Sequence, residues 1–174
     1  MQLLARQNLG MTLYIVRHAL AVPRRKWDGL DDDRPLTQTG RTQTKQLLKW
    51  SHHIEAARVL TSPTTRCIDT VRRVASAFDV TLELTEALRL EHEDEAIELA
   101  RALVESSTDA VICTHGEIIK PIMRALHPRT RGGDLDDCAK GSVWALRPEK
   151  SALIARYATN QRLPTTRSTA AKNK

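Results

Sequence analysis

Aromatic residues make up only 3% of this 174-residue sequence, which holds three tryptophans, two tyrosines and one phenylalanine. Proteins that bind single-stranded nucleic acid usually stack bases on aromatic side chains along a continuous basic stripe. Here aromatics are few and no such stripe is visible. We therefore expect no nucleic-acid partner.

Cysteines and long apolar runs are also scarce. Cys67, Cys113 and Cys138 are widely spaced and include no CxxC pair, which argues against a disulfide framework and against a thiolate zinc site. No run of about 18 apolar residues exists, so we expect no membrane-spanning helix. Residues 1–10 lack the apolar core and cleavage site of a secretory signal, and Met11 is an alternative start. We expect a cytoplasmic protein.

Positive charge exceeds negative charge, with 27 Lys and Arg against 21 Asp and Glu and a net charge of +6. Part of this excess is local, because the residues after Tyr157 include four cations and no acid. That segment is too polar to build a core. We expect an N-terminal extension over 1–11, one domain over 12–158 and a disordered, solubilising basic tail over 159–174.

Apolar runs alternate with amphipathic segments along the domain. This alternation predicts a three-layer α/β/α sandwich with a mostly parallel sheet. A terminal hairpin turning at Pro148, Glu149 and Lys150 follows, and the polar segment 19–36 predicts a long loop. The expected strands are 12–16, 57–61, 80–84, 110–113, 142–146 and 152–157, and the expected helices are 39–51, 63–77, 94–105 and 117–126.

Two helix starts carry capping signals. Thr37 or Thr39 is suited to cap the first helix, and its inward face includes Leu47 and Leu48. Ser62 followed by Pro63 predicts a cap and a first helical position for the second helix.

Arginine and histidine residues stand where three of the predicted strands end. They are Arg17 and His18 after the first strand, Arg66 in the first turn beyond the second, and His115 with Gly116 after the fourth. Open α/β sheets bind ligands at the carboxyl ends of their strands, so we expect these residues to meet at one edge. Guanidinium forks and two helix N-termini suit the oxygens of a phosphoryl group.

Two histidines in such a pocket can divide the chemistry between them. His18 is our candidate nucleophile, because a basic pocket favours the neutral imidazole that attack on phosphorus requires. His115 is then a second phosphate ligand. The leaving atom needs a proton, and the acids between Glu86 and Glu95 are the nearest candidates in sequence.

Four segments of the chain form one ordered set of motifs: Arg17-His18, Arg34-Pro35-Leu36-Thr37-x-x-Gly40, Val59-Leu60-Thr61-Ser62-Pro63-x-x-Arg66 and Thr114-His115-Gly116. Together they resemble the histidine phosphatase superfamily, whose fold is phosphoglycerate mutase-like. The resemblance covers about residues 12–157 and is greatest to compact SixA-type phosphohistidine phosphatases and to the similar domains that follow a Nudix domain in some MutT-type proteins. It implies a phosphohistidine intermediate on His18, a pocket of Arg17, Arg66 and His115, and no metal or other cofactor.

The sequence departs from the family pattern in two places. Ala19 stands where the family usually has glycine, and alanine tolerates a positive φ less well. The family's acid commonly follows a Leu-Arg pair, whereas Leu90 separates Arg89 from Glu91 here. Glu91 is our choice of proton donor. Glu86 and Glu93 are the alternatives.

The main hypothesis is a phosphohydrolase acting through His18 on a phosphohistidine protein, a nucleotide or another small phosphate. An ill-defined acid favours phosphohistidine or a phosphoanhydride over a sugar phosphate, because a phosphoramidate departs with less proton assistance. The alternative is a phosphate-binding or phosphoprotein-binding module of the same fold with impaired catalysis. A mutase would need additional loops.

Several polar residues have a structural explanation as well as a functional one. We expect Arg24, Arg34 and Thr37 at the substrate entrance, although Thr37 is explained equally by capping. Arg66 taken alone also suits a salt bridge to Asp69 or Asp79. The remaining histidines are assigned to surface or capping positions: His52, His53, His92 and His127.

Overall fold

Seven strands form one sheet in the part of the chain that the computed structural model describes, which is residues 11–106, 108–131, 134–149 and 152–158. Their order across the sheet is β3-β2-β4-β1-β6-β7-β5. The predicted basic tail and nearly all of the predicted N-terminal extension lie outside these residues. The strands are β1 (Leu13–Arg17), β2 (Arg58–Thr61), β3 (Leu82–Leu84), β4 (Ala110–Thr114), β5 (Arg129–Thr130), β6 (Val143–Glu149) and β7 (Ala152–Ala158).

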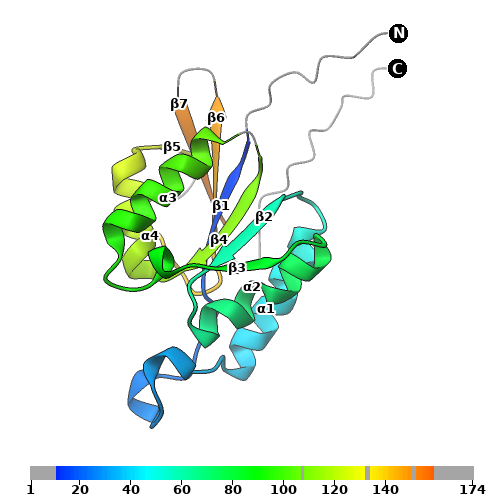
Figure 1. Ribbon diagram of the computed structural model, residues 1–174, viewed down its shortest axis with the longest axis vertical. Helices are drawn as coiled ribbons and strands as arrows, with labels where there is room; N and C mark the ends of the chain where they lie inside the picture. Colours follow the sequence, from blue (N-terminus) through cyan, green and yellow to red (C-terminus); the bar gives the residue numbers. More distant parts are fainter. Residues whose placement is uncertain (1–10, 107, 132–133, 150–151, 159–174) are drawn as a thin grey trace.

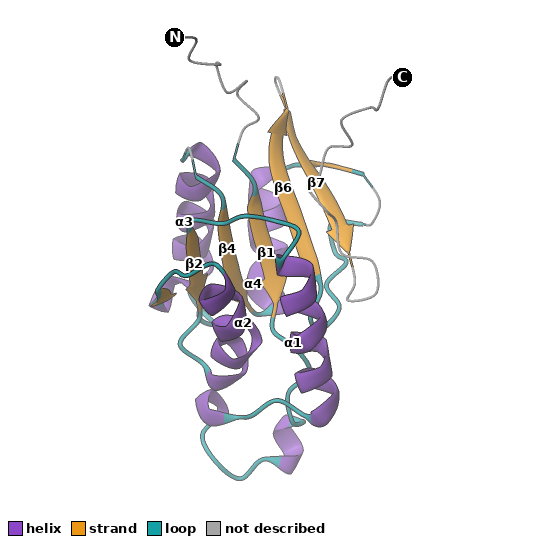
Figure 2. Cartoon of the chain, turned by 90° about the vertical axis from the view of Figure 1, so that its right-hand side faces the viewer, coloured by secondary structure: helices purple, strands orange, loops and turns teal. Residues whose placement is uncertain are grey.

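Helices cover both faces of this sheet. In Figures 1 and 2, α1 and α2 lie on one face, and α3 and α4 lie on the other. Strands β1 to β4 run parallel, while β6 is antiparallel to both β1 and β7. The expected three-layer sandwich with a mostly parallel sheet is confirmed. The helices are α1 (Gln38–Ser51), α2 (Thr65–Ala77), α3 (Glu93–Glu105) and α4 (Gly116–Leu126), with short 3-10 turns η1 (Arg24–Lys26), η2 (Asp31–Asp33) and η3 (Glu86–Leu88).

Alternating side chains of the central strands build the two halves of the core. On β1, Leu13 and Ile15 pack with α3 and α4, whereas Tyr14 and Val16 pack with α1 and α2. Successive strand residues point to opposite faces, so a strand buried on both sides is apolar throughout. The apolar runs of the sequence therefore indicate the central strands.

The start of α2 differs from the prediction. Ser62 is not its cap and Pro63 is not its first residue, because the helix begins at Thr65 with Thr64 as N-cap residue. The Ser62 amide instead donates to the Cys113 carbonyl at 3.0 Å, which extends the β2–β4 pairing by one residue. The Ser62 side chain therefore lies at the edge of the sheet, where its hydroxyl contacts His115.

The C-terminal hairpin is present, but its strands are longer than predicted. Pro148 and Glu149 belong to β6, where they pair with Leu153 and Ala152, so the predicted turn is wrong at these two positions. The fixed φ of proline is compatible with extended backbone. The two-residue strand β5 was not predicted, since so short a segment carries no periodicity.

The long loop between β1 and α1 is anchored at the N-terminus of α1. Thr37 caps that helix, and its hydroxyl accepts from the Gly40 amide at 3.0 Å while donating to the Leu20 carbonyl at 3.0 Å. A Cβ at Gly40 would lie 2.1 Å from the Leu20 oxygen, so only glycine permits this approach. Of the two proposed caps, Thr37 is the one used.

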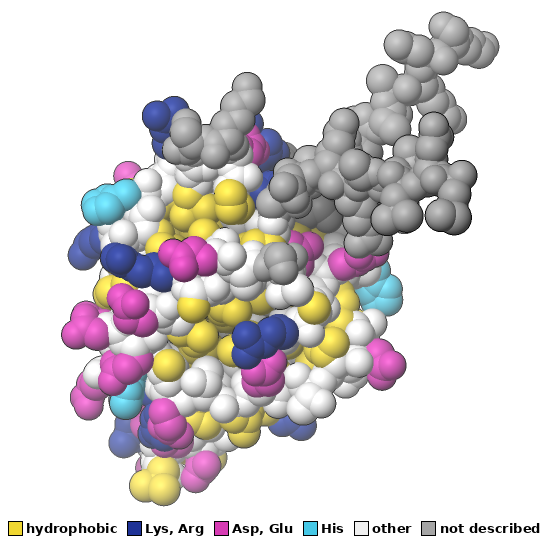
Figure 3. Space-filling view, turned by 45° about the horizontal axis from the view of Figure 1, so that its top comes forward, with side chains coloured by type: hydrophobic (Ala, Val, Ile, Leu, Met, Phe, Trp, Pro, Cys, Tyr) yellow, Lys and Arg dark blue, Asp and Glu magenta, His cyan; other side chains and the backbone are white. Residues whose placement is uncertain are grey.

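On the face seen in Figure 3, Asp and Glu side chains stand beside Lys and Arg side chains, with apolar atoms between them. Within the described residues, no helix is both long and apolar enough to cross a bilayer.

Candidate active site

The carboxyl ends of β1, β2 and β4 lie together at one edge of the sheet. Arg17 on β1 is level with Thr114 on β4, and the His18 amide donates to the Thr114 carbonyl at 3.0 Å. Ser62 follows β2 in the same way. The residues after three separate strands, His18, Ser62 and His115, therefore meet at this edge.

His18 is buried, with 2% of its surface exposed, and its ring is held in one tautomer. Its Nδ1 lies 2.8 Å from the carbonyl oxygen of Ala19. A carbonyl oxygen only accepts, so Nδ1 carries the proton and Nε2 holds the lone pair. That Nε2 lies 3.1 Å from Nζ of Lys140.

The surroundings of His18 keep its imidazole neutral. Burial, and then the positive charge of Lys140, lower the pKa of His18 from 6.5 to about 2, although its bond to Ala19 acts in the opposite direction. The positive charge of Arg66 contributes to this lowering of the His18 pKa. A buried, unprotonated nitrogen among cations is available to attack phosphorus at neutral pH.

His115 stands beside His18, with ring centroids 5.3 Å apart and an interplanar angle of 65°. An Arg66 guanidinium nitrogen lies 3.5 Å from His115 Nδ1, and Ser62 Oγ lies 3.1 Å from His115 Nε2. Because a guanidinium only donates, Nδ1 accepts and Nε2 carries the proton toward Ser62. Ser62 thus helps to fix the orientation of this ring.

Gly116 allows Arg17 to lie against the N-terminus of α4. A Cβ at position 116 would come 2.8 Å from Cζ of Arg17 and 2.9 Å from its Nε. The guanidinium also donates to the Cys138 carbonyl. Its Nε is buried without a hydrogen-bond partner among the described residues, as is Nε of Arg66.

Arg66 is buried to 1% exposure in the first turn of α2. It donates to the Asp31 carbonyl at 2.7 Å and pairs with the Asp31 carboxylate at 2.9 Å. The suggested salt bridge to Asp69 is not formed, since Asp69 pairs with Arg72. Asp79 is likewise not its partner in the described contacts.

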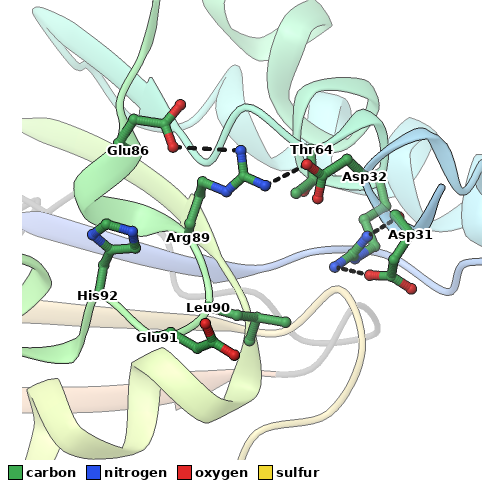
Figure 4. Close-up of a pocket in the computed structure, with 9 residues that line it drawn as sticks. Asp31, Asp32, Thr64, Glu86, Arg89, Leu90, Glu91 and His92 are labelled. Atoms are coloured by element: carbon green, nitrogen blue, oxygen red, sulfur yellow. Dashed lines mark hydrogen bonds and ion pairs between the residues drawn. The ribbon is translucent and has the colours of Figure 1, made fainter.

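A cleft of about 460 Å³ adjoins Arg66 (Figure 4). In that view Glu86 points to Arg89 and Arg89 to Asp32, whereas Glu91 lies apart from this chain of ion pairs. Glu91 is exposed and has a φ of 69°. The lining residues are Asp31, Asp32, Thr64, Arg66, Glu86, Arg89, Leu90, Glu91 and His92.

This arrangement separates the three candidate acids. Glu91 and Glu86 both line the cleft that contains Arg66, but Glu86 is paired with Arg89 at 3.4 Å. Glu93 is the first residue of α3 and is not among the lining residues.

The predicted entrance residues mostly hold the loop together. Arg34 donates to the Asp31 carboxylate at 2.9 Å and to the Val22 carbonyl at 2.8 Å, and Arg24 lies 3.4 Å from the same carboxylate. Burial acts to raise the pKa of Asp31, but the hydrogen bond from Arg34 and the charges of Arg66, Arg34 and Arg24 outweigh it and lower that pKa. Thr37 uses its hydroxyl in the helix cap. An entrance role for these residues stays a prediction.

Three further residues of this edge were missed from the sequence: Lys140, Asp31 and Ser62. Lys140 lies in an irregular segment without periodicity, and nothing in its neighbourhood signalled chemistry. Asp31 is one of three consecutive acids in the loop after β1, and a short acidic run by itself indicates no site. Ser62 was assigned to a helix cap.

Ala19 is accommodated without strain. It is not among the described residues with positive φ, and its amide donates to Thr70 Oγ1 at 2.9 Å. The geometry here does not depend on the glycine that the family usually has.

The other histidines occupy capping positions or the surface. His52 and His127 end α1 and α4, and His92 precedes α3. His53 is exposed. Within the described ranges, no group of three or more His, Cys, Asp or Glu side chains is arranged to hold a metal ion.

Residues 13–93 match the family model of the histidine phosphatase superfamily, branch 1. A curated relative, the 8-oxo-(d)GTP phosphatase of Mycolicibacterium smegmatis, is 26% identical in an alignment of 153 residues that covers 82% of this chain and 46% of that protein. The chain therefore spans about half the length of this relative. His115 and Lys140 lie beyond the family match.

Solved structures share the fold. The protein histidine phosphatase SixA complexed with tungstate superposes with a TM-score of 0.63 at 18% identity, covering 86% of this chain and 95% of that one. YhfR of Bacillus stearothermophilus gives a TM-score of 0.66 at 19% identity, with coverages of 83% and 94%. The order of the motifs and the shared fold agree with the family match, so the chain resembles the histidine phosphatase superfamily, branch 1, over residues 13–93.

Proposed function

We propose that the chain is a phosphohydrolase that transfers a phosphoryl group first to Nε2 of His18 and then to water. The observation that carries this proposal is the unprotonated Nε2 of a buried imidazole, set beside the cations Arg66 and Lys140. An attacking nitrogen and a group of cations for the phosphoryl oxygens are the two requirements of this chemistry.

In the first step the Nε2 lone pair forms a bond to phosphorus. The bond from phosphorus to the leaving atom breaks, and its electron pair departs with that atom. The Nε–H groups of Arg17 and Arg66 are buried without protein partners in the described region, so they suit the equatorial oxygens as negative charge develops. In the second step water attacks phosphorus, and the bond from phosphorus to Nε2 breaks with its electron pair returning to His18. One proton of the water goes back to the acid that protonated the leaving atom, and phosphate leaves with the other.

The departing atom takes a proton from Glu91 in this proposal. Glu91 lines the same cleft as Arg66 and, unlike Glu86, forms no ion pair shown in Figure 4. Its positive φ of 69° is uncommon for a residue with a side chain, and such conformations recur at functional sites.

The charge of the cleft favours a leaving group that is neutral or cationic. Four carboxylates line it, and its two guanidinium groups are already paired with Asp31 and Asp32. A nucleotide would bring further negative charge into this cleft, whereas the imidazole of a phosphohistidine would not. We therefore propose a phosphohistidine side chain of a protein as the preferred substrate. SixA is named as a protein histidine phosphatase and the M. smegmatis relative as a nucleotide phosphatase, so phosphohistidine and nucleotides are the two substrate classes to compare.

The proposal needs no metal or cofactor, because guanidinium and ammonium groups supply the positive charge. Turnover should be measured on p-nitrophenyl phosphate, a phosphohistidine protein, a nucleoside diphosphate and alkyl phosphates, with and without a chelator. We expect chelation to leave the rate unchanged and His18→Ala to abolish turnover. His52→Ala, in an exposed residue at the end of α1, is the matched control.

Full activity of the His18→Ala variant would overturn the proposal. A phosphoryl group trapped on His18 by acid-free quenching would support the intermediate directly. A chelator-sensitive rate would contradict the metal-independent step.

One observation favours the second candidate, a phosphate-binding module with impaired catalysis. The Asp31 carboxylate already occupies one side of Arg66, where it competes with a bound anion. The same assay separates the two functions. Phosphate binding without turnover of any probe would identify the module.

A further inference from the structure

Lys140 lies against the atom that performs the attack in the proposed function. Its Nζ is 3.1 Å from Nε2 of His18 and is half-buried in the segment that leads into β6. Because Nδ1 of His18 donates to Ala19, Nε2 can only accept, and the Lys140 ammonium is the donor. The ammonium therefore stands where the phosphoryl group must arrive.

Several contacts hold the backbone around Lys140 beside the nucleophile. The Gly141 amide donates to the carbonyls of Arg17 and His18, each at 3.2 Å, and the Lys140 carbonyl accepts from the Gln43 side chain at 3.1 Å. Gly141 has a φ of 73°, a conformation that glycine adopts without strain. The position of Lys140 is thus built into the edge of the sheet, and it is not a free surface lysine.

The cost of this position is electrostatic. An ammonium beside Arg17 and partly removed from water is disfavoured, so burial and the positive charge of Arg17 lower the pKa of Lys140 to about 8. The Glu117 carboxylate acts in the opposite direction. The titratable and charged groups that face Lys140 are Arg17, His18, Arg34, Arg66, Glu117 and Cys138.

We propose that Lys140 is a catalytic phosphate ligand, which holds the His18 lone pair in the resting protein and passes its hydrogen bond to a phosphoryl oxygen as Nε2 attacks. The inference rests on the proposed function and deepens it. The lone pair cannot bind a proton donor and phosphorus at once, so the hydrogen bond to Nε2 breaks when the nitrogen–phosphorus bond forms. Lys140 neither gains nor loses a proton in this step. Its charge then stabilises the phosphorylated His18.

This role explains why a cation is tolerated against a histidine that it keeps neutral. The cations Lys140 and Arg66 next to His18 disfavour protonation of Nε2 before attack. The same two cations attract the dianionic phosphoryl group. Residues kept at a cost in stability are typical of functional sites.

The test compares Lys140→Met and Lys140→Arg with Lys49→Met, a matched control in an exposed lysine of α1. We expect kcat/KM for p-nitrophenyl phosphate to fall about 100-fold in Lys140→Met, as on removal of one preorganised donor. Lys140→Arg should retain most of the activity. The control should match the wild-type protein.

The pH profile separates a ligand from a merely structural residue. Wild-type kcat/KM should decline above about pH 8 as Lys140 loses its proton, since its pKa lies near 8. This alkaline limb should move to higher pH in Lys140→Arg and be absent from the residual activity of Lys140→Met. An unchanged limb in both variants would overturn the inference. The melting temperature of Lys140→Met should equal or exceed that of the wild type, because a buried repulsion is removed.

Binding of orthophosphate, measured by calorimetry, separates failure of this inference from failure of the proposed function. If the wild-type protein binds orthophosphate but turns over no probe, the proposed phosphohydrolase function is contradicted. The role of Lys140 as a phosphate ligand is then decided by comparing the orthophosphate affinities of the wild type and Lys140→Met. An affinity at least about 10-fold weaker in Lys140→Met supports the ligand role. Equal affinity and equal turnover in Lys140→Met and wild type would overturn it, while loss of turnover in His18→Ala would still support the phosphohydrolase.

Discussion

Arg66 binds Asp31 twice, through a 2.7 Å hydrogen bond to its carbonyl oxygen and a 2.9 Å ion pair with its carboxylate. Asp31 belongs to η2 in the long loop after β1, so this contact ties the loop to the first turn of α2. The carbonyl positions the guanidinium, while the carboxylate lowers the positive charge offered to a phosphoryl group. A substitution of the Asp31 side chain can therefore remove the neighbouring negative charge while the carbonyl contact still positions Arg66.

Asp31→Asn should tighten the binding of phosphate. The substitution keeps the carbonyl contact that positions Arg66 and removes the competing negative charge. We expect the Kd for orthophosphate and the KM for p-nitrophenyl phosphate to fall about 3- to 10-fold, as expected for loss of one partly exposed like charge near an anion. Calorimetry and steady-state kinetics measure the two constants.

Asp33→Asn is the matched control, since it removes one carboxylate from the same 3-10 turn at an exposed position. It should leave both constants within twofold of the wild type. Weaker phosphate binding in Asp31→Asn would show that the carboxylate serves mainly to orient Arg66.

The sequence predicted those parts of the site that follow central strands. Arg17, His18 and His115 stand directly after apolar runs, and the parallel order of β1, β2 and β4 brings such positions to one edge. The periodicity of a buried strand is strong, so its end is well defined. The positions of these residues in space followed from strand direction alone.

Lys140 and Asp31 could not be predicted by the same reasoning. Lys140 reaches the edge because β6 runs antiparallel to β1, which puts the start of β6 beside the end of β1. The hairpin itself was predicted, but its direction relative to β1 has no local signal. Asp31 depends on how a long loop folds back, and loop conformation is set by contacts distant in sequence.

Acid should destabilise the protein through His18. The pKa of His18 is about 2 in the folded protein and near 6.5 when the chain is unfolded, so between these values the unfolded chain binds one more proton. The contribution is fully present above pH 6.5 and is lost as the pH falls. It amounts to about 2 kcal/mol between pH 7.5 and 5.0.

His18→Asn isolates this term, because its side-chain amide can still donate to the Ala19 carbonyl but does not titrate. Urea unfolding at pH 7.5 and 5.0 should show a loss of stability that is about 2 kcal/mol smaller in the variant than in the wild type. Equal losses would contradict a neutral buried imidazole. His52→Asn should reproduce the wild-type loss.

Gly116→Ala should impair the site without unfolding the protein. Alanine suits the first turn of a helix, so α4 itself is not weakened. The new Cβ, however, would lie 2.8 Å from Cζ of Arg17, and the guanidinium must move. We expect kcat/KM to fall about 10- to 100-fold, because misplacement by about 1 Å is costly.

Orthophosphate affinity should fall together with kcat/KM in Gly116→Ala, while the free energy of unfolding changes by about 1 kcal/mol or less. Calorimetry and urea unfolding supply these two values. Wild-type kinetics in the variant would mean that Arg17 need not lie against the N-terminus of α4.

Glu91→Gln should reveal its effect through the leaving group. The amide keeps the size of the side chain but cannot donate an acidic proton. An alkyl phosphate, which must release a strongly basic alkoxide, should lose about 100-fold or more in kcat. p-Nitrophenyl phosphate and phosphohistidine have better leaving groups and should lose only a few-fold. Glu98→Gln, on the exposed face of α3, is the control with unchanged rates.

The same series measured on Glu86→Gln and Glu93→Gln decides among the three acids. Glu86 is paired with Arg89, and Glu93 is not among the residues that line the cleft. The change in kcat relative to the wild type should therefore not depend on the leaving group in either variant. Selective loss of alkyl phosphate turnover in Glu86→Gln would move the role of proton donor to that residue. If Glu91→Gln turns over every substrate at the wild-type rate, water protonates the leaving atom. The enzyme is then restricted to substrates with good leaving groups.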